Sequence, residues 1–117
     1  HRLNVQMMHI LRETLSEVDL VIQLFYVGQE PGGGERFVLD LLAEVSTPVI
    51  LVPNKIDLVP DIDRRTRRTD FYTRARDYAA VTAVSALAGD GLEALKREIF
   101  QRLPEGSWLV NPEYTTT

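Results

Sequence analysis

The sequence predicts an α/β fold with three layers, in which three parallel strands occur in chain order and helices pack on both faces of the sheet. Three apolar runs of strand length support this prediction, at residues 19–27, 48–52 and 80–84. Between consecutive runs the apolar residues take a helical spacing, and parallel strands need long crossovers that are usually helical. The alternation therefore indicates βαβ units.

The amino-terminal part predicts a helix followed by a buried strand. Apolar side chains recur at helical spacing from Leu3 to Val18, and the run from Asp19 to Val27 has Gln23 as its main polar interruption. A run this apolar suits a strand that is covered on both faces. The glycine-rich stretch 28–34 then ends the pattern.

Two helix–strand pairs and a last helix follow. Apolar stripes with helical spacing precede the strand Pro48 to Val52 and the strand Ala80 to Val84. The stripes consist of Phe37, Val38, Leu41, Leu42 and Val45, and of Phe71, Tyr72, Ala75, Tyr78 and Ala79. In the last helix Asp90 and Glu93 resemble a capping box, and Pro104 ends the helix.

Two short motifs stand directly after the second and third predicted strands. Asn54-Lys55-Ile56-Asp57 follows the second strand, and Ser85-Ala86-Leu87 follows the third. Ligands of open α/β sheets bind outside the carboxyl ends of the strands. We therefore expect the two motifs to line one pocket.

The residue types in these motifs match guanine. Asp57 can accept hydrogen bonds from guanine N1–H and its N2 amino group, whereas adenine would leave the carboxylate unpaired. Asn54 offers an amide for the N7/O6 side or for tying the two loops together, and the stem of Lys55 can lie along the base. Ser85 and Ala86 are small enough for close approach of the backbone, and the Ala86 N–H can donate to O6. The alternative is a plain loop, in which Asn54 closes an Asx turn and Asp57 caps a helix.

Three other features have simpler explanations than a binding site. Gly32-Gly33-Gly34 has no lysine beside it and is predicted to be a loop that does not bind phosphate. His1 and His9 lack a metal-ligand spacing and are predicted to lie on the surface. The arginines between 64 and 76 are interleaved with and flanked by aspartates, which predicts a solvated, ion-paired helix face and not an RNA surface. These aspartates are Asp61, Asp63, Asp70 and Asp77.

The two motifs resemble those of the translation-factor-like GTPases, and within them the Era GTPases. The first is similar to the family's NKxD motif and the second to its SAL motif. Segments 18–22, 47–52, 54–59 and 103–106 are also similar to Era segments, so the resemblance covers nearly the whole chain. It implies a partial P-loop GTPase G domain at residues 1–104 and, at 105–117, a linker toward an absent KH domain. The residues that it implies for binding GTP or GDP are Asn54, Lys55, Asp57, Ser85, Ala86 and Leu87.

Two phosphate-binding elements of that family are missing from these 117 residues. The sequence has no G-x-x-x-x-G-K-[ST] motif and no D-x-x-G motif. The chain is therefore expected to be a fragment that lacks the amino-terminal strands and the phosphate loop. No catalytic residue and no metal site are expected in it, Mg²⁺ belongs only to the intact family domain, and hydrolysis by the chain alone is not expected.

Two departures from the family pattern lie near the predicted site. Val27-Gly28-Gln29 stands where the family usually carries Val-Asp-Ala after the first strand. Pro53 precedes Asn54 where an aliphatic residue is usual, and it removes a backbone donor from the strand end. We expect the strand to survive and the Asn54 loop to change its orientation.

Composition and resemblance together limit the partners. A formal charge of −4 argues against a general nucleic-acid surface, and the absence of cysteine excludes disulfides and thiolate metal sites. No apolar run approaches the ~20 residues of a membrane span. The resemblance implies small-subunit ribosomal RNA and the ribosome as partners of the intact protein, and a cytoplasmic location that is sometimes peripheral to the inner membrane.

Two further expectations follow for the chain by itself. In the family the first strand here pairs with the phosphate-loop strand, so the chain is expected to expose a sheet edge. Such an edge favours self-association or a complementary amino-terminal fragment. The alternative function is a nucleotide-free protein interaction module in which the GTPase motifs are relics.

Overall fold

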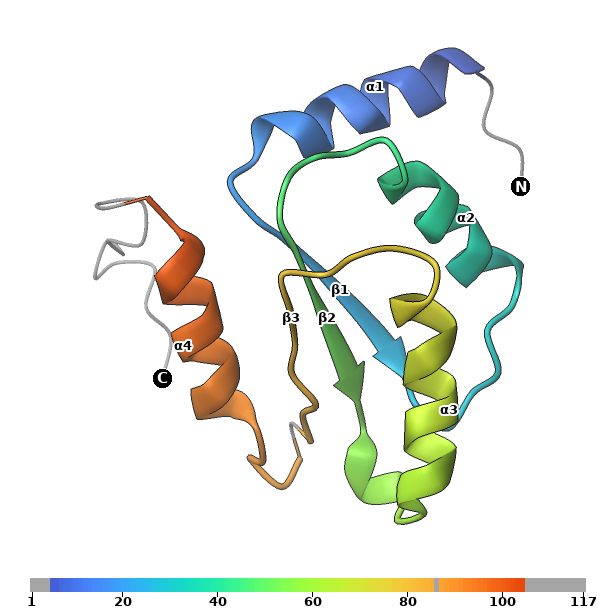
Figure 1. The fold of residues 1–117 in the computed structure, drawn as a ribbon, viewed down its shortest axis with the longest axis vertical. Helices are drawn as coiled ribbons and strands as arrows, with labels where there is room; N and C mark the ends of the chain where they lie inside the picture. The colour runs from blue at the N-terminus through green and yellow to red at the C-terminus, as the bar shows by residue number, and fades with distance from the viewer. Residues whose placement is uncertain (1–4, 86, 105–117) are drawn as a thin grey trace.

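A computed structural model describes residues 5–85 and 87–104. It contains a parallel three-stranded sheet in the order β1-β2-β3, with helices on both faces (Figure 1). The elements are α1 (Val5–Glu17), β1 (Val21–Tyr26), α2 (Gly33–Leu42), β2 (Val49–Asn54), the 3₁₀ helix η1 (Ile56–Leu58), α3 (Ile62–Thr73), β3 (Ala80–Val81) and α4 (Leu92–Arg102). The predicted α/β class, with parallel strands in chain order, is confirmed. No helix in the described part of the chain is long and apolar enough to cross a membrane.

The core consists of two apolar clusters on opposite faces of the sheet. On one face Phe25 and Leu51 pack with Tyr72 of α3. On the other face Ile50 and Val52 pack with Leu95 and Ile99 of α4, among others. The central strand β2 is buried on both faces, because it is covered by α3 on one side and by α4 on the other (Figure 1).

Strand β1 is buried on one face only, so the prediction that both faces are covered is wrong. Gln23 and Phe25 are buried, whereas Ile22, Leu24 and Tyr26 on the opposite face are 40%, 60% and 36% exposed. The helix on that face, α4, packs on β2 and leaves these three side chains uncovered. Among the described residues β1 pairs with β2 alone, which leaves its other edge without a partner strand.

The third strand is shorter than predicted, and Pro53 explains this. The regular strand covers Ala80–Val81, although Thr82 N–H still donates to Leu51 O and Val84 N–H to Pro53 O. The carbonyl of Pro53 thus faces the third strand, and a residue in a strand directs its N–H to the same side. Since proline has no N–H, the return hydrogen bond cannot form and the regular ladder ends.

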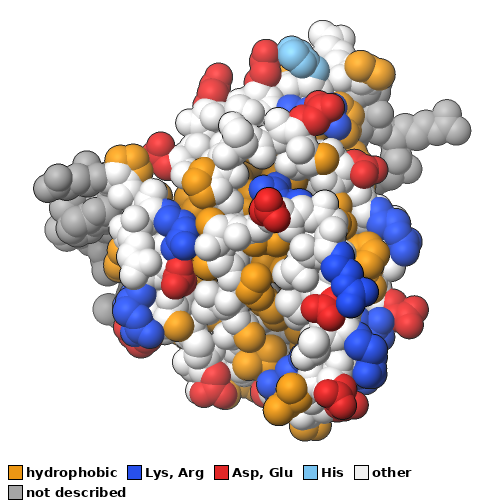
Figure 2. Space-filling model, viewed as in Figure 1, with side chains coloured by type: hydrophobic (Ala, Val, Ile, Leu, Met, Phe, Trp, Pro, Cys, Tyr) orange, Lys and Arg blue, Asp and Glu red, His pale blue; other side chains and the backbone are white. Residues whose placement is uncertain are grey.

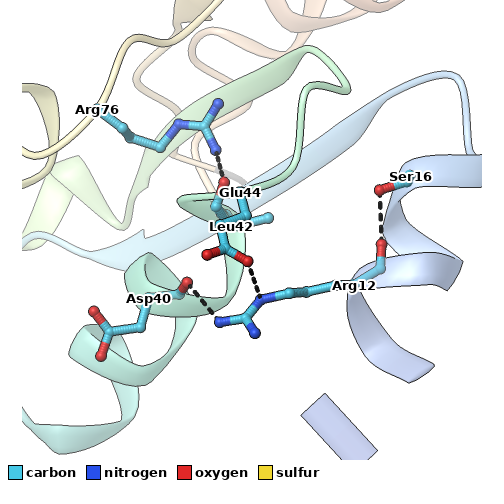
Figure 3. A network of polar contacts seen from close by, with 6 residues as sticks. All are labelled: Arg12, Ser16, Asp40, Leu42, Glu44 and Arg76. Atoms are coloured by element: carbon cyan, nitrogen blue, oxygen red, sulfur yellow. Dashed lines mark hydrogen bonds and ion pairs between the residues drawn. The ribbon is translucent and has the colours of Figure 1, made fainter. Parts of the chain in front are cut away.

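Helix α1 has no fully buried side chain, and polar contacts attach it to the neighbouring helix and loop. Arg12 donates to Asp40 O and pairs with Glu44 at 3.7 Å (Figure 3). From the other side Arg76 donates to Leu42 O at 3.0 Å (Figure 3). Two cations therefore contact the carboxyl end of α2, where the helix dipole favours positive charge.

The last two helices differ from the predicted patterns at their ends. Helix α3 spans Ile62–Thr73, so the stripe residues Ala75, Tyr78 and Ala79 lie beyond it. The expected capping box of Asp90 and Glu93 is wrong, because α4 begins after Gly91, which has φ +80° and no side chain to cap with. The end of α4 before Pro104 is confirmed. Residues 105–117, the predicted linker, lie outside the described residues.

The arginines near α3 are ion-paired only in part, although blue and red side chains intersperse on this side of the molecule (Figure 2). Arg74 pairs with Asp70 at 3.7 Å, as the alternating charges predict. Arg68 instead pairs with Glu30, and Arg65 is half-buried and donates to backbone carbonyls. His9 is exposed and contacts Glu13. The described residues contain no group of three or more His, Asp or Glu side chains that could hold a metal ion.

Candidate functional site

The two motifs lie side by side at the carboxyl ends of β2 and β3, at the end of the sheet opposite α1 (Figure 1). Val84 N–H donates to Pro53 O at 2.8 Å, and Ile56 N–H donates to Val84 O at 3.4 Å. These backbone hydrogen bonds join the loop after β2 to the segment before Ser85. The proximity that the strand-end positions predict is therefore present.

Asp57 and Ser85 form the central polar contact. The Ser85 hydroxyl donates to Asp57 Oδ1 at 2.6 Å, across 28 residues of sequence. Ser85 is fully buried, and its oxygen in turn accepts from Ala88 N–H at 3.3 Å. A carboxylate has about four acceptor positions, so the exposed Asp57 keeps capacity for further donors.

Asn54 and Lys55 shape the start of this loop. Asn54 Oδ1 accepts from the N–H of Lys55 at 2.8 Å, a hydrogen bond within its own loop, and among the described residues no hydrogen bond of this side chain reaches the second loop. Lys55 has φ 59° and ψ 39°, the only left-handed conformation of a non-glycine residue in the described chain. This turn directs the lysine toward β1, where its Nζ lies 5.1 Å from the ring centroid of Tyr26.

The plain-loop alternative is not supported in its details. The residue that caps α3 is Asp61, which accepts from Asp63 N–H and Arg64 N–H. Asp57 makes its contact with Ser85 instead. The hydrogen bond of Asn54 reaches only the next residue, whereas an Asx turn spans two.

The segment between Ser85 and Asp90 forms a tight turn beside the site. Ser85 N–H donates to Asp90 O, and Gly89 N–H donates to Ser85 O at 2.7 Å. Both Gly89 and Gly91 have φ +80°, a conformation that side chains rarely allow. Ala86 lies outside the described residues, so its N–H remains a prediction from the sequence.

An open pocket of about 470 Å³ lies between the two loops, lined by Asn54, Lys55, Asp57, Leu58 and Leu87. Leu87 is 91% exposed and Leu58 is 59% exposed. Two uncovered leucines beside a carboxylate and a lysine stem suit a flat ligand with apolar faces and a polar edge. A purine base has this shape and chemistry.

Three features of the site are absent from the sequence prediction. Tyr26 pairs with Asn54 in the β1–β2 register. Its position near the end of the first predicted strand indicates that it lies at the same edge of the sheet as the two motifs. Leu58 follows the first motif directly. The hydroxyl contact of Ser85 with Asp57 spans 28 residues of sequence, and no local pattern indicates it.

Comparison with curated proteins shows similarity over nearly the whole chain. The chain is 37% identical over 116 residues to a protein named GTPase Era from Thermoanaerobacter sp. (strain X514). The matched region covers 98% of this chain and 38% of that protein. It is 38% identical to GTPase Era from Caldanaerobacter subterraneus and from Heliobacterium modesticaldum, over 115 and 106 residues. The chain thus spans well under half the length of these relatives. No family model matches it.

Solved structures share the fold. A crystal structure of Era in complex with MgGDPNP and a segment of 16S ribosomal RNA superposes with a TM-score of 0.73 at 22% identity, covering 98% of this chain and 40% of that one. An Aquifex aeolicus Era variant bound to GDP and tetrafluoroaluminate gives 0.71 at 24% identity, covering 93% and 36%. Apo elongation factor SelB from Methanococcus maripaludis gives 0.64 at 18% identity, covering 80% and 22%.

Proposed function

We propose that this chain, which is Era-like over nearly its whole length and has the α/β fold of part of a GTPase G domain, recognises the guanine base of GTP or GDP. The observation that supports this most is the Asp57 carboxylate, which Ser85 holds at the wall of an open pocket. A carboxylate fixed in this way discriminates between purines, because only guanine presents two adjacent donors.

The residues of the two motifs have the following roles in this proposal. Asp57 accepts from guanine N1–H and the N2 amino group, and Ser85 positions Asp57. The Lys55 stem and Leu87 contact the faces of the base, and Asn54 keeps the loop in its turn through Lys55 N–H. The Ala86 N–H donates to O6 in this proposal. No residue of this stretch is assigned to the phosphates, to Mg²⁺ or to hydrolysis.

Partners beyond the nucleotide belong to the protein family, and we extend them to this chain only as part of the proposal. The Era structure that contains 16S ribosomal RNA supports ribosomal RNA as a partner. A role in small-subunit assembly and a cytoplasmic location are parts of the same proposal. The free edge of β1 is the place where a further strand would pair. That strand would come from a complementary amino-terminal segment or from a second copy of the chain.

A nucleotide titration of the chain tests the proposal. With base contacts alone, a guanosine gains at most about −6 kcal/mol, so the Kd should be no tighter than on the order of 10⁻⁵ M. Chemical-shift titration at millimolar nucleotide therefore suits the measurement. We expect GDP to shift amides around Asp57 and Ser85 and ADP to shift them much less. Equal shifts with both nucleotides would favour the nucleotide-free interaction module.

The variant Asp57→Asn tests the role of the carboxylate directly. The amide presents a donor to one of the guanine donors, which costs ~1–3 kcal/mol for the unpaired groups. Xanthine has a carbonyl in place of the N2 amino group, so xanthosine diphosphate should become the better ligand of the variant. An unchanged preference for guanine in a variant that is folded by circular dichroism would show that Asp57 does not contact the base.

A further inference from the structure

We propose that Arg65 is a positioning residue that holds the turn carrying Asp57, an inference that rests on the proposed recognition of guanine. Arg65 is the fourth residue of α3 and is half-buried. Its Nη2 donates to Ile56 O at 2.6 Å, and its Nε donates to Val59 O. Both carbonyls belong to the segment that contains Asp57.

Both carbonyls accept a hydrogen bond from the positively charged side chain of Arg65. Ile56 is the first residue of η1 and Val59 directly follows its last. The Val59 carbonyl lies past the end of η1 and has no partner within that helix. The Ile56 carbonyl accepts from Val59 N–H, and its second lone pair remains for Arg65. A planar guanidinium can satisfy two carbonyls at once, and charged donors form stronger hydrogen bonds than neutral donors.

Arg65 completes the attachment of η1 from the side opposite β3. Toward β3 the turn is held by Ile56 N–H donating to Val84 O and by Ser85 donating to Asp57. The side chains of Ile56 and Val59 pack into the core that includes Tyr72 of α3. Only Arg65 adds polar contacts between α3 and this turn among the described hydrogen bonds. Without it, η1 would keep its β3 contacts but could rotate about them, and the carboxylate of Asp57 would leave its position.

The other arginines near the start of α3 contact different groups. Arg64 donates to Gly28 O at 3.1 Å, and Arg68 pairs with Glu30. Arg67 is exposed on the same helix and provides a matched control, since its removal deletes the same charge. The comparison of Arg65 with Arg67 therefore separates the positioning effect from the change in net charge.

The experiment compares Arg65→Met, Arg65→Lys and Arg67→Met in the full chain. The first readout is amide hydrogen exchange at Leu58 and Val59, whose N–H groups donate to Lys55 O and Ile56 O. The second readout is the ratio of Kd values for IDP and GDP, because inosine lacks only the N2 amino group that Asp57 is proposed to bind. Thermal unfolding reports any general loss of stability.

We expect Arg65→Met to speed exchange at both amides by about tenfold and to reduce the guanine-over-inosine preference toward equality. Arg65→Lys keeps one charged donor and should restore part of both effects, while Arg67→Met should resemble the unmodified chain. Unchanged exchange, or faster exchange with an unchanged preference, would overturn the positioning role even if the melting temperature falls. If the unmodified chain shows no guanine preference, the proposed function fails, and hydrogen exchange by itself decides whether Arg65 holds the turn.

Discussion

Gly89 and Gly91 in the loop after Ser85 share one backbone conformation but differ in their surroundings. Both have φ +80°, yet a Cβ at Gly91 would lie 2.1 Å from Ala83 O, whereas a Cβ at Gly89 would meet nothing within 4 Å. The left-handed conformation costs both positions about 1–2 kcal/mol for a non-glycine residue. The main-chain contact adds a penalty only at Gly91, because backbone cannot move aside as a flexible side chain can.

We therefore predict that Gly91→Ala destabilises the protein more than Gly89→Ala. The expected difference in the free energy of unfolding is a further ~1–3 kcal/mol for the crowded site. Urea unfolding of both variants measures it. Equal losses would mean that the loop relaxes freely around Ala83, and the turn would then be less constrained than its geometry indicates.

Asp61 defines where α3 begins. Its carboxylate accepts from Asp63 N–H at 3.0 Å and from Arg64 N–H at 3.4 Å, which satisfies two donors that have no partner within the helix. The start of α3 also carries Arg65, and only residues 59–61 separate it from η1. A well-formed start of α3 is therefore a condition for the placement of Asp57.

We predict that Asp61→Ala lowers the free energy of unfolding by about 1 kcal/mol. Asp61→Asn should lose much less, because asparagine also accepts hydrogen bonds at this position. Circular dichroism during urea unfolding gives both values. A loss as large for asparagine as for alanine would point to the charge of Asp61 and not to its capping hydrogen bonds.

At the scale of the whole molecule, two tyrosines join α2, α3 and the sheet in one apolar cluster. Tyr72 stacks on Phe25 with ring centroids 4.2 Å apart, and the Tyr78 hydroxyl donates to the buried Gln23 at 2.7 Å. Burial raises the pKa of Tyr72 to about 12, with a smaller contribution from the charge of Glu35. Burial also raises the pKa of Tyr78 to about 12, although Arg76 and the hydrogen bond to Gln23 oppose the rise.

These pKa shifts predict a loss of stability at alkaline pH. Between about pH 10 and pH 12 the folded protein keeps phenol protons that the unfolded chain releases, so a rising pH favours unfolding. Below pH 10 both states are protonated and the two groups cause no pH dependence. Urea unfolding across this range should show a steady fall, and Tyr72→Phe should make it shallower. A variant with the same slope as the unmodified chain would contradict the raised pKa of Tyr72.

The sequence by itself determined the α/β class and the order of the strands, and it predicted the place of the candidate site. These follow from local features, because apolar periodicity marks each element and the end of a buried strand marks where a ligand can bind. The meeting of the loops at Asn54 and Ser85 was predictable for the same reason. The guanine-binding role of these residues remains a prediction.

Only the tertiary structure decided how the side chains in the site are held. The hydroxyl of Ser85 on Asp57, the ring of Tyr26 beside Lys55 and the two carbonyls bound by Arg65 are contacts between different elements. Sequence spacing cannot reveal them, because an arginine on a polar helix face has the same pattern whether it faces water or a loop. The prediction that both faces of β1 are covered was wrong for a related reason, since an apolar run shows which residues avoid water but not which neighbouring element is present to cover them.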